Sequence, residues 1–162
     1  GDWLLFQNET DNQHYAAVTA KTLGLKVAYA AAPFDAPAVE AVLDRLDLLV
    51  LNEVEAAQLQ RTTGLAADSL PVRDVIVTLG AQGCRWHGQG GSQDFAALPV
   101  EPVDTTGAGD TFTGYVLAGL ERSMPMAQAI SFGLKAAGIM VTRSGTADVI
   151  PDLKDLQDAQ LI

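Results

Sequence analysis

The chain is poor in cysteine and in basic residues. It has one cysteine, Cys84, and ten Lys and Arg against twenty Asp and Glu, which gives a formal charge of -10. A single cysteine excludes an internal disulfide and a cysteine-based metal site, so a reducing compartment is favoured, and the cytoplasm is the simplest choice. The excess of acidic residues, with no run of Lys or Arg, argues against nucleic acid and anionic membranes as partners.

Long apolar runs are also missing, so the sequence offers no segment of membrane-spanning length. The chain opens on an apolar run with neither a basic leader nor a small-residue cleavage site, and we expect no secretory signal. With 48% hydrophobic and 19% charged residues, 162 residues can bury one sizeable core. We therefore expect a single domain over residues 1–162.

Short apolar runs alternate with longer amphipathic runs in the first half of the chain, a pattern typical of strands and helices wound into a parallel sheet. Strands are predicted over 3–7, 26–30, 48–51 and 74–78, and helices over 15–23, 38–45 and 53–62. The glycine-rich stretch 80–98 predicts an antiparallel hairpin, with strands over 84–87 and 94–98. Helices are predicted over 110–121, over 126–141 and from residue 152. The fold class is thus α/β, with a mostly parallel sheet and a short antiparallel hairpin region.

A glycine-rich turn leads into a helix at residues 103–114, Val-Asp-Thr-Thr-Gly-Ala-Gly-Asp-Thr-Phe-Thr-Gly. Gly107 and Gly109 remove the side chains that would keep a phosphate away. The amide groups of Ala108, Gly109 and Asp110 would then face outward at a helix N-terminus, where the helix dipole attracts anions. This segment predicts a phosphate site.

Asp110 is unusual there, because a phosphate repels a carboxylate unless the carboxylate has a task such as accepting a proton from an incoming nucleophile. The alternative is that Asp110 only caps the helix. Two other phosphate motifs do not fit the same residues. Phe112 stands where a dinucleotide fingerprint needs its third glycine, and the chain has no Gly-x-x-x-x-Gly-Lys-Ser/Thr loop.

The eleven residues 104–114 closely resemble the C-terminal signature of the ribokinase-like carbohydrate kinases, also called the phosphofructokinase B family. The resemblance implies a three-layer α/β/α fold, ATP as donor and transfer of its γ-phosphoryl group to a sugar hydroxyl. It makes Asp110 the catalytic base, and it makes the backbone amides from Gly107 through Ala108 and Gly109 to Asp110 the anion hole.

The resemblance also implies a nucleotide site. Asn52 and Glu55 match the family's Asn-x-x-Glu element, which organises Mg²⁺, water and phosphate, although the same spacing is that of a helix capping box. Thr78, Gly80 and Gly83 match the Thr-x-Gly-x-x-Gly turn that lines the nucleotide, although a hairpin turn would need the same glycines.

A carboxylate near the sugar is implied at Glu9, just past a predicted strand, where an isolated Glu would otherwise be solvated surface.

A monovalent cation site, with K⁺ as the expected ion, is implied around Asp104 and Thr106 and the carbonyl groups of Met140, Arg143 and Gly145. Where the family carries a hydroxyl-bearing residue, this chain has Val149, a departure that bears on the cation dependence.

The resemblance covers nearly the whole chain but only about the C-terminal half of the family's usual length. The family's N-terminal part, its sugar contacts and its β lid are therefore expected to be absent. A second hypothesis follows, in which the chain is a nucleotide-binding or assembly module without transfer activity. Among kinases, the acceptor is left open between ribose, ketodeoxygluconate, a fructose phosphate or fructose, and a nucleoside. The lid commonly builds the dimer in this family, so a homodimer is an expectation only.

Overall fold

The structure, a computed structural model, describes residues 2–159. Its contacts divide the described chain into two units, and each is treated separately below. The first unit contains residues 2–80 and 84–95, and the second contains residues 81–83 and 96–159. The expectation of one domain over residues 1–162 includes positions 1 and 160–162, which lie outside the described residues, and it stays a prediction.

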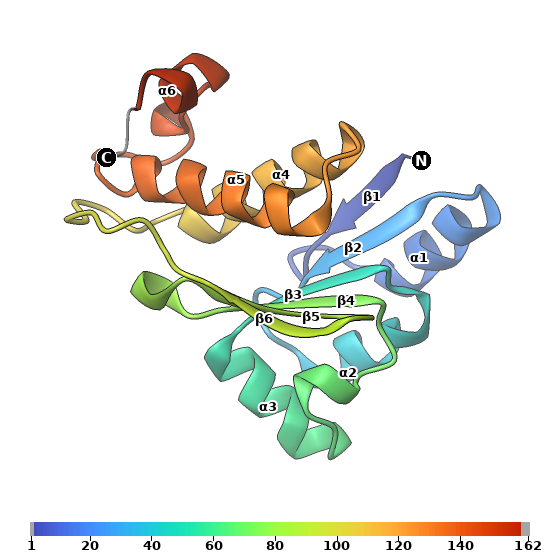
Figure 1. Cartoon of the computed structure of the whole chain (residues 1–162). Coiled ribbons are helices and arrows are strands. Elements are labelled where there is room, and N and C mark those ends of the chain that lie inside the picture. The colour runs from blue at the N-terminus through green and yellow to red at the C-terminus, as the bar shows by residue number, and fades with distance from the viewer. Residues whose placement is uncertain (1, 160–162) are drawn as a thin grey trace. The chain divides into compact units, whose positions relative to one another are not determined.

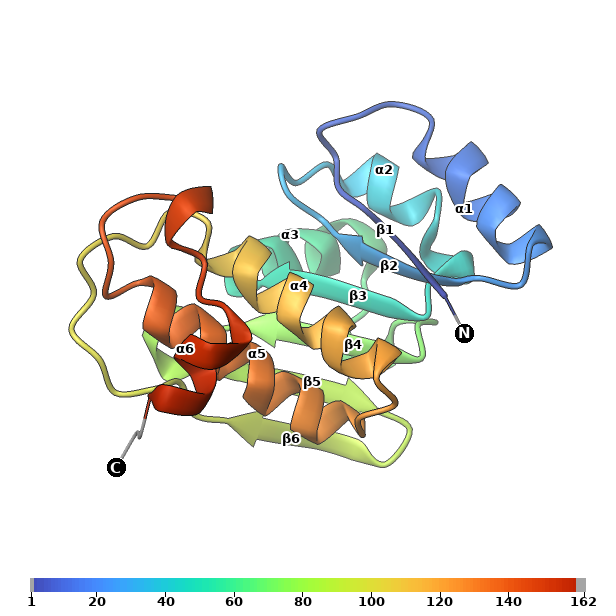
Figure 2. The same cartoon turned by 90° about the horizontal axis from the view of Figure 1, so that it is seen from above.

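The first unit is built on a six-stranded sheet whose order in space follows the order in sequence (Figure 2). The strands are β1 (Trp3–Phe6), β2 (Lys26–Ala30), β3 (Leu48–Asn52), β4 (Asp74–Thr78), β5 (Cys84–Gly88) and β6 (Gly91–Phe95). The first four are parallel to one another, whereas β5 is antiparallel to β4 and β6 to β5. The predicted mostly parallel sheet with an antiparallel hairpin is confirmed.

Three helices of this unit, α1 (Gln13–Thr22), α2 (Ala36–Glu40) and α3 (Glu53–Thr63), connect the parallel strands. Right-handed crossovers between strands that neighbour in sequence order place successive helices on the same face of a sheet. Figure 1 shows these helices with the strands that they connect, and one buried cluster joins all three helices to the strands. Its members include Ala17 and Ala20 from α1, Val39 from α2, Leu59 from α3, and Val27, Tyr29, Leu49, Leu51, Val75 and Val77 from the sheet.

The predicted helix 38–45 is wrong in its extent. The structure has the five-residue α2, then a separate 3-10 turn η1 at Leu43–Arg45. Val42 breaks the helix with φ -123° and ψ -6°. The break was hidden in the sequence because Val39, Val42 and Leu43 are all buried, and their spacing is that of one continuous helical stripe.

The second strand of the hairpin, predicted at 94–98, is also wrong in position, because β6 covers Gly91–Phe95. The pairing of Gly88 with Gly91 leaves only two residues in the turn. β6 lies at the sheet edge and is almost wholly exposed, and Phe95 is its only large apolar residue, so no apolar alternation marks it.

The second unit is helical. α4 (Ala108–Glu121) and α5 (Met126–Met140) pack along each other, and α6 (Leu153–Asp158) contacts α5. A Cβ atom on Gly133 would lie 2.8 Å from the Phe112 carbonyl oxygen, so α4 and α5 approach each other closely at this point. Beside it, the Tyr115 and Phe132 rings meet edge to face with centroids 5.0 Å apart. None of the helices described, up to the 15 residues of α5, is long and apolar enough to cross a membrane.

Candidate active site

The carboxyl ends of β3 and β4 place two of the predicted site residues side by side. Asn52 and Thr78 are direct partners in the parallel register. The Thr78 hydroxyl donates to the Leu51 carbonyl oxygen at 3.4 Å, which turns it toward β3. Because ligands of open α/β sheets bind beyond the carboxyl ends of the strands, this edge is the candidate ligand edge of the first unit.

Asn52 and Glu55 form a reciprocal capping box at the start of α3. The Asn52 side chain accepts from the Glu55 N–H at 2.8 Å, and the Glu55 carboxylate accepts from the Asn52 N–H at 2.7 Å. Burial raises the pKa of the Glu55 carboxyl, and the hydrogen bond from Asn52 partly opposes that rise. The capping interpretation of this pair is therefore confirmed, and a role toward Mg²⁺ stays a prediction.

The turn after β4 contains Gly80 and Gly83, the two glycines of the predicted nucleotide-binding turn. Gly80 opens a 3-10 turn, η3 (Gly80–Gln82), and Gly83 follows it. The pairing of Thr78 with Cys84 shows that this turn joins two antiparallel strands. Gly80 and Gly83 therefore lie in a turn between antiparallel strands, as the hairpin interpretation expects, and their contact with a nucleotide stays a prediction.

Glu9 lies on an exposed loop between β1 and α1, and its neighbour Asn8 fixes that loop. The Asn8 backbone N–H donates to the Ala32 carbonyl at 3.0 Å, and its side-chain amide donates to the Pro33 carbonyl at 2.9 Å. The buried Tyr29 hydroxyl donates to the Asn8 side-chain oxygen. Burial is the main cause that raises the pKa of Tyr29 to about 12. Sequence reasoning missed Asn8 and Tyr29, because residues 21 positions apart of these ordinary types give no signal.

In the second unit, the predicted phosphate segment begins α4. Gly107 is the N-cap residue, with φ 80° and ψ 2°, a left-handed conformation that glycine adopts most readily. The Ala108 N–H donates to the Thr105 carbonyl at 3.2 Å, so one of the three amides expected to face outward is engaged in the turn. A Cβ atom on Gly109 would have no other heavy atom within 4 Å, so the space beside the helix start is open there.

Asp110 is the third residue of α4 and is exposed. It is therefore not the N-cap residue of α4, which is Gly107 and has no side chain to cap the helix. Below the turn, the Thr111 hydroxyl donates to the Met140 sulfur at 2.7 Å, and both side chains are buried. This contact ties the start of α4 to the end of α5, and sequence reasoning did not identify it.

The loop before α4 is bonded to the loop after α5. The N–H groups of Val103 and Asp104 both donate to the Val141 carbonyl, at 2.7 and 3.2 Å. The Asp104 carboxylate accepts from the Thr106 N–H at 2.9 Å. Hydrogen bonding to Thr106 lowers the pKa of Asp104, and the backbone of Gly145 adds a smaller lowering. The structure thus brings together the predicted cation-site residues Asp104, Thr106 and Gly145.

Gly145 has no room for a side chain. Its φ is 135°, and an added Cβ would lie 2.9 Å from both the Asp148 carboxylate and a Val149 methyl group. The backbone of this loop is thereby held close to its own side chains, with the carbonyl groups of Met140 and Arg143 a few residues before it.

The donor set of this loop pair suits a monovalent cation better than a divalent one. Within residues 2–159 no three or more His, Cys, Asp or Glu side chains are grouped so that they could hold a metal ion. The predicted ligands are mostly backbone carbonyls with one carboxylate, Asp104, and carbonyl oxygens are what replaces the hydration shell of K⁺ in proteins. The residues present therefore fit K⁺, whose binding stays a prediction.

Known proteins resemble the chain over nearly all of its length. A family model described as pfkB family carbohydrate kinase matches residues 6–153. Ribokinase of Haemophilus influenzae is 35% identical over 162 residues, which cover 93% of this chain and 53% of the relative. The crystal structure of ribokinase from Thermotoga maritima matches with a TM-score of 0.85 at 30% identity, over 97% of this chain and 56% of its own.

A ribokinase structure from Arabidopsis thaliana, complexed with ribose and ATP, matches with a TM-score of 0.82 at 27% identity, over 96% of this chain and 54% of its own. The chain thus spans about half the length of the curated relatives it matches. These likenesses confirm the α/β fold class expected from the sequence.

Proposed function

The chain belongs to the pfkB family of carbohydrate kinases, and on this premise we propose that it supplies the ATP-binding and catalytic part of a sugar kinase. The reaction is transfer of the γ-phosphoryl group of ATP to a sugar hydroxyl. The observation that carries the proposal is the exposed Asp110 in the first turn of α4, beside the open space at Gly109. The helix dipole favours a carboxylate in the first turn, but that carboxylate would repel a phosphate bound at the same helix start, so its place at a phosphate site points to a part in the chemistry.

In the proposed mechanism, the sugar hydroxyl oxygen attacks the γ-phosphorus of ATP while its proton passes to the Asp110 carboxylate. The bond between the γ-phosphorus and the bridging oxygen breaks, and ADP leaves. Backbone N–H groups at the start of α4 offset the charge on the transferred group, and little other covalent chemistry is required of the protein. Under the second hypothesis, a binding module without transfer activity, Asp110 would only stabilise the start of α4, and its negative charge would weaken phosphate binding there.

Two cations belong to the proposal. Asn52 and Glu55 supply amide and carboxylate oxygens of the kind Mg²⁺ accepts, directly or through water. Mg²⁺ would neutralise phosphate charge. Asp104, Thr106 and the carbonyl-bearing loop through Gly145 would hold K⁺, which would lend positive charge to the turn that leads into α4.

The acceptor is proposed to be a sugar, with Glu9 as a carboxylate that accepts hydrogen bonds from its hydroxyl groups. The hydrogen bonds of Asn8 hold the loop that carries Glu9 beyond the carboxyl end of β1, which supports this assignment. Ribose, fructose, a fructose phosphate, ketodeoxygluconate and a nucleoside are all compatible with one carboxylate. A reducing, cytoplasmic location is proposed from the single cysteine.

The test is ATP binding by titration calorimetry together with sugar-dependent ADP release in Mg²⁺ and K⁺ across those five acceptors. Micromolar to millimolar ATP affinity is expected, and ADP release with one of the acceptors would identify the sugar and show that this chain alone assembles a working site. ATP binding with no ADP release would show that this chain holds the donor half of the site and that the acceptor half lies in sequence outside it. Failure to bind ATP would overturn the proposal.

A further inference from the structure

Arg143 lies in the loop that follows α5, between two of the carbonyl groups assigned to the cation. Its backbone N–H donates to the Met140 carbonyl at 2.9 Å, which continues the end of α5 by one turn. The position of its own carbonyl therefore depends on how the next residues of the loop are held. Those residues, from 144 to 149, contain only one short 3-10 turn, η4 (Ala147–Val149).

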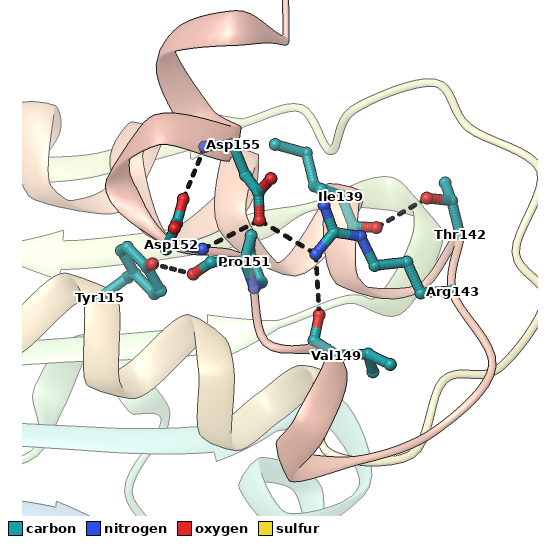
Figure 3. Close-up of polar contacts among 8 residues, drawn as sticks. All are labelled: Tyr115, Ile139, Thr142, Arg143, Val149, Pro151, Asp152 and Asp155. Atoms are coloured by element: carbon teal, nitrogen blue, oxygen red, sulfur yellow. Dashed lines mark hydrogen bonds and ion pairs between the residues drawn. The ribbon is translucent and has the colours of Figure 1, made fainter.

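The Arg143 side chain closes this loop. Its guanidinium donates from one nitrogen to the Val149 carbonyl at 3.2 Å and to the Asp155 carboxylate at 3.1 Å (Figure 3). The first bond ties the two ends of the loop together across six residues. The second bond ties the loop to α6.

Asp155 is itself held in place, so it can serve as an anchor. Its carboxylate also accepts from the Asp152 N–H at 3.1 Å, and its own N–H donates to the Asp152 side chain at 2.8 Å (Figure 3). These two bonds form a capping box at the start of α6. The segment just before it is fixed as well, because the Tyr115 hydroxyl of α4 donates to the Pro151 carbonyl.

The predicted cation ligand Asp104 lies near the other side of the loop, because the Gly145 backbone is among the groups that lower the pKa of its carboxyl. The loop is therefore held at its two ends by Arg143. Arg143 also places a positive charge in a loop proposed to bind a cation. Its ion pair with Asp155, whose side chain is 38% exposed, offsets that charge.

We propose that the Arg143 side chain is a positioning residue for the monovalent cation, because it holds loop 143–149 in the shape that presents its carbonyl groups. The inference rests on the proposed function, since it assumes the cation site. A side chain that only stabilised the fold would affect stability equally with and without K⁺. A positioning side chain changes the K⁺ concentration at which the protein responds.

The experiment is a titration of the 162-residue chain with KCl, with choline chloride replacing it at constant ionic strength. The readouts are the thermal unfolding midpoint and the hydrogen exchange of the Thr106 and Gly145 amides. Arg143→Met removes both hydrogen bonds and the charge. Arg143→Lys keeps the charge and can restore one bond. The matched control is Arg122→Met, an exposed arginine of the same unit beyond the end of α4.

The wild-type chain is expected to show saturable stabilisation by K⁺. Arg143→Met should need roughly tenfold more K⁺, as is usual when a group behind metal ligands is removed, with Arg143→Lys in between and Arg122→Met unchanged. If Arg143→Met does not fold, Asp155→Ala removes the acceptor that anchors Arg143 while keeping Arg143 itself, and the K⁺ concentration needed for half of the stabilisation should also rise. The inference is overturned if these variants need the same K⁺ concentration as the wild type for half of the stabilisation. It is also overturned if K⁺ does not stabilise the wild-type chain. ATP binding measured on the same samples decides the kinase proposal separately.

Discussion

Replacing Gly109 with alanine tests whether the open space at the start of α4 receives phosphate. The added methyl group would meet no heavy atom within 4 Å, so it should cause no steric strain. Alanine is more favourable than glycine in a helix interior by about 1 kcal/mol, and by less in the first turn. The free energy of unfolding of Gly109→Ala should therefore stay the same or rise by up to about 1 kcal/mol.

The same methyl group would stand where the proposed mechanism brings the ATP phosphates. We expect the dissociation constant for ATP to rise at least tenfold, which is about 1.4 kcal/mol. The matched control is Gly107→Ala, two residues earlier. There φ is 80° and the new methyl group would lie 3.0 Å from the terminal methyl of Met140, so the control should lose roughly 1–2 kcal/mol of stability.

Urea unfolding and titration calorimetry with ATP, run on both variants and on the wild-type chain, provide the comparison. Normal stability with weakened ATP binding in Gly109→Ala is the expected pattern. If Gly109→Ala binds ATP as tightly as the wild-type chain, the start of α4 is not where the phosphates lie, and the reasoning from the open space fails.

Three further predictions concern buried groups. Tyr29→Phe should cost about 1–3 kcal/mol, because the side chain of Asn8 loses a donor. The folded pKa of Tyr29, about 12, lies above its ordinary value of 10, so its contribution to stability is complete below pH 10 and is lost as the pH rises toward 12. Urea unfolding at pH 8 and pH 11 should show that Tyr29→Phe lacks this alkaline loss, and an identical loss in both proteins would contradict the assignment. Cys84 is buried and its pKa is raised to about 12, so an aromatic disulfide reagent at pH 8 should label it only in urea, and rapid labelling of the folded chain would disprove its burial. Gly133→Ala should lower the free energy of unfolding by about 1–3 kcal/mol through its contact with the Phe112 carbonyl, and wild-type stability would refute that close packing.

Most strands and helices could be predicted from the sequence because their signals are local. The strands at 26–30 and 74–78 match β2 and β4 at both ends, since buried parallel strands are short apolar runs bounded by polar residues and glycine. α3 was predicted to within one residue because its capping box and its terminal glycine, Gly64, lie next to it in sequence. The failures at α2 and β6 occurred where apolar spacing was misleading or absent.

Residues of the candidate site also differ in whether a local sequence pattern indicates them. The turn from Gly107 to Asp110 and the pair Asn52 and Glu55 are consecutive or closely spaced, so their types and intervals mark them as site candidates, and their roles stay predictions. The contacts that hold the loop of Glu9 and the loop after α5 join distant positions, as Tyr29 does with Asn8 and Arg143 with Asp155. Such pairs depend on tertiary packing, and no local pattern indicates them.

The measurement that tests the central claim most directly compares Asp110→Asn with the wild type in the form of the protein that phosphorylates an acceptor in the ADP-release assay. The change removes the base but keeps the backbone amides of the α4 start. We predict that kcat falls by a factor of roughly 10²–10⁴, the usual contribution of a general base, while the dissociation constant for ATP stays within about twofold. Retained turnover, or a loss of ATP binding as large as the loss of kcat, would contradict the assignment of Asp110 as the catalytic base.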